Sequence, residues 1–155
     1  MPSSFFAGAT IPQLILPVVV AVVILATISL LAEPARQKFS AIFLAGAGGA
    51  YLSGGFGWWE LAFCGVVTAL AYAGLSHYRA IAIGWLAHTA WDFLHHLYGN
   101  PIIPFAPTSS FGCAICDPVI ALWYAIGAPS IWTIFKPSAG HGYAAAPSGR
   151  SGKNG

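Results

Sequence analysis

The stretch LPVVVAVVILATISLLA, residues 16–32, contains no charged side chain and only two hydroxyl-bearing ones, Thr27 and Ser29. Together with residues 11–15 it forms an apolar segment of the length, about 20 residues, that an α-helix needs to cross the hydrocarbon core of a bilayer. No Lys or Arg precedes it, and its apolar core is longer than that of a cleavable signal peptide. Residues 11–32 therefore predict a retained transmembrane helix.

The composition of the whole chain points the same way. Only 6 % of the 155 residues are charged, whereas soluble domains carry roughly 25 % charged residues, so this chain cannot build an ordinary water-facing surface. The net charge of +2 and the absence of a basic patch argue against a nucleic-acid partner. We expect an integral membrane protein surrounded by membrane lipids.

Five apolar segments recur along residues 1–136. They span about 11–32, 40–56, 58–76, 80–98 and 118–135. They predict an all-α fold, a polytopic membrane helix bundle of about five transmembrane helices, although the short, glycine-rich second segment is also compatible with a re-entrant loop. Pro129 should kink the fifth helix. Residues 137–155 are rich in Ser, Gly, Ala and Pro, which predicts a disordered C-terminal tail.

The basic residues give an orientation. With five spans, all six fall on one side of the membrane: Arg36, Lys38, Arg79, Lys136, Arg150 and Lys153. Because positively charged loops stay on the cytoplasmic side, this distribution predicts an N-out/C-in topology. We expect a multi-pass protein of a bacterial inner (plasma) membrane.

Small residues recur at four-residue intervals in the second segment, as in Ala45/Gly49 and Gly46/Ala50. Such spacing lets helices approach closely in lipid, whereas the spacing does not fit a nucleotide-binding loop. We interpret the glycines as a packing face, which could also support a homo-oligomer.

The main concentration of titratable groups is HTAWDFLHH, residues 88–96. On a helix that turns by about 100° per residue, His88, Asp92, His95 and His96 fall within an arc of about 100°. An ionisable side chain within a membrane span is a functional-site hypothesis by default because its burial is costly. One helix face is therefore the candidate site.

Further polar groups map to the same outer side. Glu60 begins the third span, Asp117 begins the fifth, and Cys113 and Cys116 lie on the preceding outer loop. Imidazole and carboxylate ligands suit a divalent metal ion, with zinc favoured and iron or copper as alternatives. The expected ligands are His88, Asp92, His95 and His96.

The other outer groups would support that site. Glu60 and Asp117 would act as a catalytic base or would orient a ligand. Cys113 and Cys116 form a CxxC pair that fits a disulfide, metal ligation or two unrelated thiols. A hydrogen-bond network that ties the helices together without metal is the alternative for the whole cluster.

Three segments, AGAGGAYLSGGFGWWELAF, HTAWDFLHHLYGNPIIPF and GCAICDPVIALW, resemble a family of small bacterial and fungal membrane proteins of unknown function. The resemblance covers roughly residues 30–135. It implies a shared membrane fold but assigns no activity, cofactor or catalytic residue.

These observations lead to competing hypotheses on function. The first is a metal-dependent membrane hydrolase or oxidoreductase that acts on a lipid-like substrate entering from the outer leaflet. The second is a proton- or metal-coupled transporter or binding protein with the His/Asp face as its ion path. The third is a non-catalytic membrane scaffold in which the cluster fixes helix packing.

Overall fold

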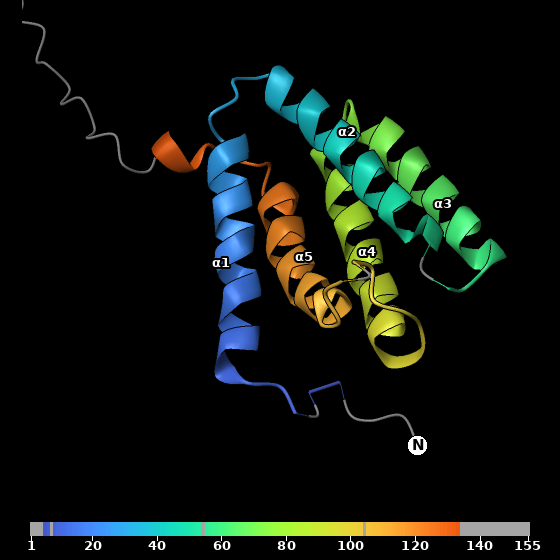
Figure 1. Cartoon of the computed structure of the whole chain (residues 1–155). Helices are drawn as coiled ribbons and strands as arrows, with labels where there is room; N and C mark the ends of the chain where they lie inside the picture. Colours follow the sequence, from blue (N-terminus) through green and yellow to red (C-terminus); the bar gives the residue numbers. More distant parts are fainter. Residues whose placement is uncertain (1–4, 7, 54, 104, 134–155) are drawn as a thin grey trace, which may run out of the picture.

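The computed structural model describes residues 5–6, 8–53, 55–103 and 105–133. That part of the chain contains five α-helices, two short 3₁₀ helices and no β-strand (Figure 1). The elements are α1 (Ile11–Ile28), α2 (Ala35–Gly49), η1 (Ala50–Ser53), α3 (Trp58–Gly74), α4 (Tyr78–Tyr98), α5 (Ser109–Ala125) and η2 (Ile131–Thr133). The expectation of an all-α protein with five helices is confirmed.

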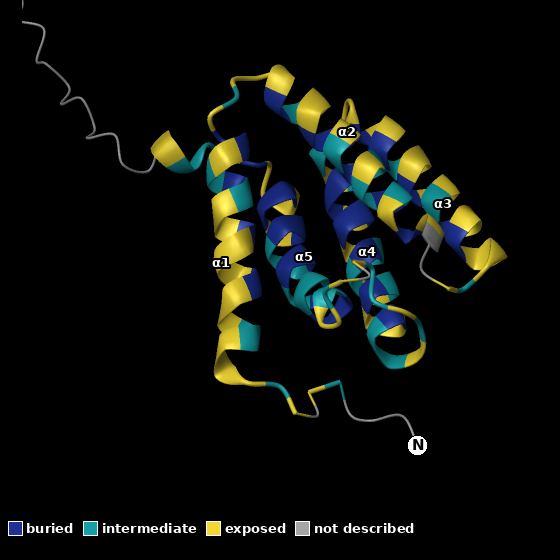
Figure 2. Cartoon of the chain, in the orientation of Figure 1, coloured by how far each residue is buried: buried dark blue, intermediate teal, exposed yellow. Residues whose placement is uncertain are grey.

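The central pair of the bundle is α4 and α5, which make the most extensive helix–helix contact. Helix α1 packs on α5, while α2 and α3 pack on each other and on α4 (Figure 1). As a consequence of this packing, α4 and α5 are the most extensively buried helices and α1 is largely exposed (Figure 2). Buried side chains of all five helices form the core.

The fifth helix differs from its expected bounds of 118–135. It begins at Ser109 and ends at Ala125, and Pro118 lies inside it. A proline often marks a helix start because its missing N–H is unneeded there, which made Pro118 look like the first residue of a span. The helix stops where Gly127 and Ala128 adopt positive φ angles of 89° and 50°, before Pro129. The interpretation of residues 99–116 as one outer loop was therefore wrong, since Cys113 and Cys116 lie on α5 with Asp117.

The second helix also differs from the segment 40–56. It covers Ala35–Gly49 and continues directly into η1, where the chain tightens into a 3₁₀ turn. Tyr51 lies on this turn and is only 3 % exposed, so its ring points into the bundle. The predicted tail, residues 137–155, lies outside the described residues.

Helix α1 begins with a capping box in which the Thr10 N–H donates to Gln13 Oε1 at 2.9 Å. Judged by length and apolar composition, α1 is the one helix among the described residues that could cross a membrane. A signal sequence would pass the same test. Helices α3 and α5 are apolar but shorter.

Helices α2 and α4 cross closely at Gly84. A Cβ atom on Gly84 would overlap the side chain of Leu44, which is fully buried. We expect Gly84→Ala to lower the free energy of unfolding by about 1–3 kcal/mol, the usual range for overpacking a filled interior. Denaturant titration in detergent micelles measures this change.

Gly65 on α3 is the matched control, because it is exposed and nothing lies within 4 Å of its added Cβ. Gly65→Ala should be neutral or stabilising by up to about 1 kcal/mol, since alanine favours the helix. Equal destabilisation by the two substitutions would contradict the close α2–α4 approach.

A polar cluster ties the α1–α2 connection to the start of α4. Arg36 Nε donates to Glu33 Oε1 at 2.7 Å, and the Tyr78 hydroxyl donates to the same oxygen at 2.6 Å. Burial alone would raise the pKa of Glu33, but the hydrogen bonds from Tyr78 and Arg36 and the charge of Arg36 outweigh it and lower the pKa.

The lowered pKa of Glu33 gives a pH dependence with a defined sign. The unfolded chain takes up the proton at a higher pH than the folded protein does, so the contribution of Glu33 to stability is complete above its ordinary pKa of 4.5 and is lost as the pH falls. The thermal midpoint of the native protein should therefore drop more between pH 6 and pH 3 than that of Glu33→Gln. An equal drop of the thermal midpoint in the two proteins over this pH range would refute the contribution of Glu33.

Candidate functional site

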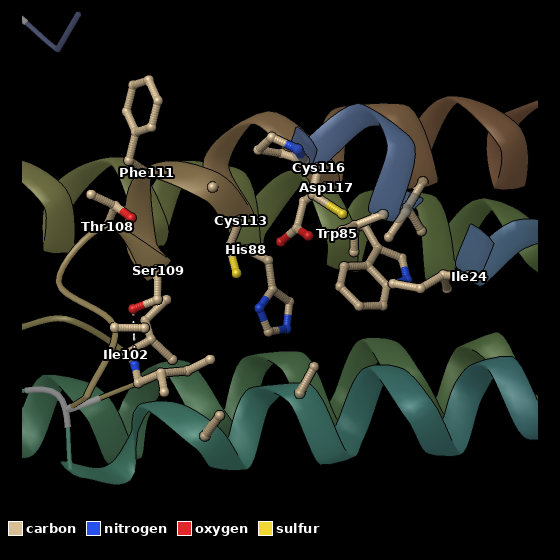
Figure 3. A pocket seen from close by; sticks show the side chains of 18 of the residues that line it. Ile24, Trp85, His88, Ile102, Thr108, Ser109, Phe111, Cys113, Cys116 and Asp117 are labelled. Atoms are coloured by element: carbon tan, nitrogen blue, oxygen red, sulfur yellow. Dashed lines mark hydrogen bonds between the residues drawn. The ribbon is translucent and has the colours of Figure 1, made fainter. Parts of the chain in front are cut away.

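The structure contains a cavity of about 610 Å³ between α1, α2, α4 and α5 (Figure 3). Four residues of the connection from α4 to α5 contribute to one end of it, namely Ile102, Ile103, Ala106 and Thr108. Most of the wall is apolar, including Leu16, Pro17, Val20, Ile24, Phe43, Ile102 and Ile120. The size lies within the range of about 300–1,000 Å³ that is typical of small-molecule sites.

Polar side chains are concentrated on one part of the wall. Figure 3 shows His88, Cys113 and Asp117 close together there, with Trp85 and Cys116 nearby. Tyr51 reaches the cavity from η1. Because α4, α5 and η1 supply these groups, the packing of three elements creates a polar patch in a mostly apolar wall.

A buried hydrogen-bonded chain runs through Asp92, Tyr51 and His88, which we call the Asp–Tyr–His chain. The Tyr51 hydroxyl donates to Asp92 Oδ1 at 2.6 Å and lies 3.0 Å from His88 Nδ1. Since the hydroxyl has one proton and uses it on Asp92, this network assigns the imidazole proton to Nδ1, which donates to the Tyr51 oxygen. The neutral imidazole then keeps its lone pair on Nε2.

That second nitrogen of His88 is buried without a well-formed hydrogen bond among the described residues, although the Leu44 carbonyl lies near the ring. His88 itself is 1 % exposed and lies on the cavity wall. A free, oriented imidazole nitrogen of this kind can accept a proton from a group bound in the cavity.

Asp117 meets Asp92 across the α4–α5 contact. The two carboxyl groups are close enough to share a hydrogen bond when one of them holds a proton. Two buried carboxylates at such a distance repel each other when both are ionised, so one shared proton is the favourable arrangement. Asp117 lines the cavity, whereas Asp92 lies behind it and also accepts from Tyr51.

A second cluster, separate from the cavity, contains Glu60 and His95. His95 Nε2 lies 3.1 Å from Glu60 Oε1, and His95 Nδ1 lies 3.2 Å from the carbonyl oxygen of Asn100. Both ring nitrogens of His95 therefore lie within hydrogen-bond distance of oxygen atoms. Glu60 also accepts from the Trp91 indole at 3.0 Å and from the Phe56 N–H at 3.0 Å. This cluster joins α3 and α4 to the segment that follows α4.

The predicted site residues therefore divide into groups instead of meeting at one point. His88, Asp92 and Asp117 come together at the cavity, and Glu60 pairs with His95 elsewhere. His96 contacts the N-terminal segment, with its Nε2 3.2 Å from the Phe5 carbonyl oxygen. Within the described ranges, no three His, Cys, Asp or Glu side chains are arranged so that they could hold a metal ion.

Cys113 and Cys116 are both free thiols, and both line the cavity. Their spacing of three places them on one side of α5. They lie beside the Asp–Tyr–His chain, which is the neighbourhood that the sequence predicted for them, although they reach it from a helix and not from a loop.

Two contributors were not predicted as site residues. Tyr51 links Asp92 to His88, and Trp91 donates to Glu60. One feature of the sequence could have identified Tyr51 as a site residue: it is the only hydroxyl-bearing aromatic residue in the glycine-rich segment 45–56. Trp91 had no such feature, because a tryptophan in an apolar helix is ordinarily a packing residue.

The model of a family of unknown function, DUF6010, matches residues 12–130. The chain belongs to the DUF6010 family. The resemblance to a family of unknown function is confirmed, and the DUF6010 region contains every residue of the cavity wall and of the two polar clusters. No curated protein and no solved structure matched the chain.

Proposed function

We propose that this DUF6010 protein is a multi-pass membrane protein that binds a lipid-like substrate in its cavity and hydrolyses it by acid–base chemistry. The observation that carries the proposal is the position of the Asp–Tyr–His chain beside a mostly apolar cavity, with His88 and Tyr51 on its wall. An apolar wall with a few convergent polar groups is the usual form of a ligand site.

Exposed apolar surface supports a membrane location. The 18-residue window of α1 has a mean hydropathy of 2.6 and only 17 % of it is buried, so α1 presents apolar side chains outward instead of to a core. Large apolar residues are exposed on the other four helices as well, among them Ile42, Val66, Leu86 and Leu122. Soluble monomers rarely expose continuous apolar surface of this extent.

The distribution of charge supports the orientation. The α1–α2 connection meets the start of α4 through Tyr78 and Glu33, which brings Arg36, Lys38 and Arg79 to one end of the bundle. The loops at the other end carry no basic residue in the described ranges. We therefore retain an N-out/C-in arrangement in a bacterial inner membrane, with the cavity in the outer half.

The chemistry assigns roles to two side chains. His88 Nε2 takes a proton from a water molecule as the water attacks the substrate, and the Asp–Tyr–His chain stabilises the imidazolium that forms. Asp117 gives its proton to the leaving oxygen or nitrogen and regains a proton from His88. Tyr51 and Asp92 orient His88 and act as positioning residues.

The test uses full-length protein in detergent or nanodiscs. Mass spectrometry of the purified protein should find a bound molecule with a long apolar chain, and incubation with a total membrane lipid extract should yield new cleavage products. A protein that carries and cleaves no lipid, although it is folded and the cavity is intact, would overturn the proposal.

A metal ion is a second candidate for the same site, as the sequence suggests. Buried polar atoms without partners favour it, namely His88 Nε2 and Asp92 Oδ2. Zinc fits imidazole and carboxylate donors best, with iron or copper as alternatives. Elemental analysis should then find about one equivalent of metal, which His88→Ala removes and His96→Ala retains. Metal-free protein with full activity would exclude this candidate.

A further inference from the structure

We propose that the cavity selects long-chain esters or amides whose head group donates hydrogen bonds and carries no negative charge, and excludes lipids with a phosphate or carboxylate head. This inference rests on the proposed function, because it names the substrate class of the same cavity. Three features carry it: the charges around the cavity, the unpartnered polar atoms on its wall, and the position of its mouth.

The charges exclude an anionic head. No lysine or arginine belongs to the cavity wall in the described part of the chain. The acidic residue on the wall is Asp117, and Asp92 lies directly behind it. Even with one proton shared between them, the pair keeps one negative charge in an apolar surrounding, where water screens it poorly. A phosphate head placed there would meet repulsion and find no cationic partner.

The polar atoms of the wall that lack hydrogen-bond partners favour a head group that donates hydrogen bonds. His88 Nε2 is an unpartnered acceptor, and Asp117 offers carboxyl oxygen. Among the buried nitrogen and oxygen atoms of the described wall residues, Trp85 Nε1 is the one donor left without a partner. A hydroxyl or amine can donate to His88 or Asp117, whereas a fully ionised phosphate can only accept. Buried acceptors that remain unpaired weaken binding, so the wall discriminates by hydrogen bonding as well as by charge.

The mouth of the cavity suits a molecule that arrives from the bilayer. Leu16 and Val20 of α1 line the cavity while they remain 63 % and 44 % exposed, so the cavity opens to the outside along α1. Phe43 and Ala47 of α2 form the facing wall. An apolar chain can lie between α1 and α2 with its head beside His88 and without crossing water.

Matched probes test the inference directly. Three brominated lipids with the same chain carry a hydroxyl, an amine or a phosphate head, and bromine near the cavity quenches the fluorescence of Trp85. The quenching is measured for purified protein in detergent, and the signal that remains in Trp85→Phe is subtracted. We expect the alcohol and the amine to bind at least about tenfold more tightly than the phosphate.

Asp117→Asn should reduce the preference for the alcohol and amine probes over the phosphate probe, because it raises the affinity for the phosphate. Glu33→Gln is the matched control, because Glu33 lies at the opposite end of the bundle, and it should leave the preference unchanged. Displacement of the brominated alcohol by an unbrominated alkyl phosphate measures the same preference in unaltered protein, so the result does not depend on how a variant folds.

The results of the probe experiment separate the selection of head groups from lipid binding itself. Equal binding of the three probes, or tighter binding of the phosphate, overturns the selection for uncharged or cationic heads but leaves lipid binding in the cavity intact. A phosphate preference that disappears with a chelator also overturns it and points to a metal ion. If no probe quenches Trp85, the proposed function itself fails.

Discussion

Replacing His88 with alanine should lower the rate of substrate turnover by a factor of about 10²–10⁴, the contribution that a positioned general base usually makes. The expected loss is large because His88 Nε2 is the acceptor that the Asp–Tyr–His chain orients, and His88 is the one histidine of the cavity wall among the described residues. Turnover of the lipid identified by mass spectrometry, compared at saturating substrate, measures the effect.

His96→Ala provides the control within the same helix. His96 has the same side chain but contacts the Phe5 carbonyl and does not line the cavity. Its replacement should leave turnover within a few-fold of the native rate. Tyr51→Phe should give an intermediate loss, because it removes the link to Asp92 but keeps the imidazole. A His88→Ala protein that is folded and fully active would exclude His88 as the base.

Replacing Glu60 with alanine should lower the free energy of unfolding by about 3–5 kcal/mol, the range observed when one member of a buried ion pair is removed. The side chains of Glu60 and His95 are 3 % and 0 % exposed, so His95 Nε2 would stay buried without its partner. The Trp91 indole N–H and the Phe56 N–H would lose their acceptor as well. Denaturant unfolding in micelles reports the change.

Glu60→Gln separates charge from hydrogen bonding. The amide carries no charge but keeps an oxygen for the Trp91 or Phe56 donor, so the loss should be smaller than for alanine. Lipid binding in the cavity should persist in Glu60→Gln, because Glu60 lies outside the cavity wall. A loss below about 1 kcal/mol for Glu60→Ala would show that the pair behaves like an exposed one.

The number and type of helices could be predicted because the information is local. An apolar run such as residues 16–32 specifies a helix through its own length and composition. The limits of α5 could not be predicted in this way. Pro118 has the properties of a helix start, but α5 already begins at Ser109. The earlier turns of α5 form in the context of its packing against α4 and α1, which the local sequence does not reveal.

The composition of the site was predictable only in part. The spacing of HTAWDFLHH correctly placed His88, Asp92 and His95 on the buried side of one helix, where each is at most 1 % exposed. Which side chain each of them contacts depends on which helix packs against that turn of α4. Asp92 meets Asp117 of α5, whereas His95 meets Glu60 of α3. No spacing within a single segment contains that information.

Helix α1 has a role that differs from that of the other elements. It contributes Leu16, Pro17, Val20 and Ile24 to the cavity wall but no member of the polar chain, which belongs to η1, α4 and α5. In the proposed function, α1 would thus contact the alkyl chain without supplying a reacting group. Substitutions along one helix can lengthen, shorten or branch the alkyl chain that fits, while the reacting groups keep their alignment. A protein built in this way can diversify its substrates without redesigning its catalyst.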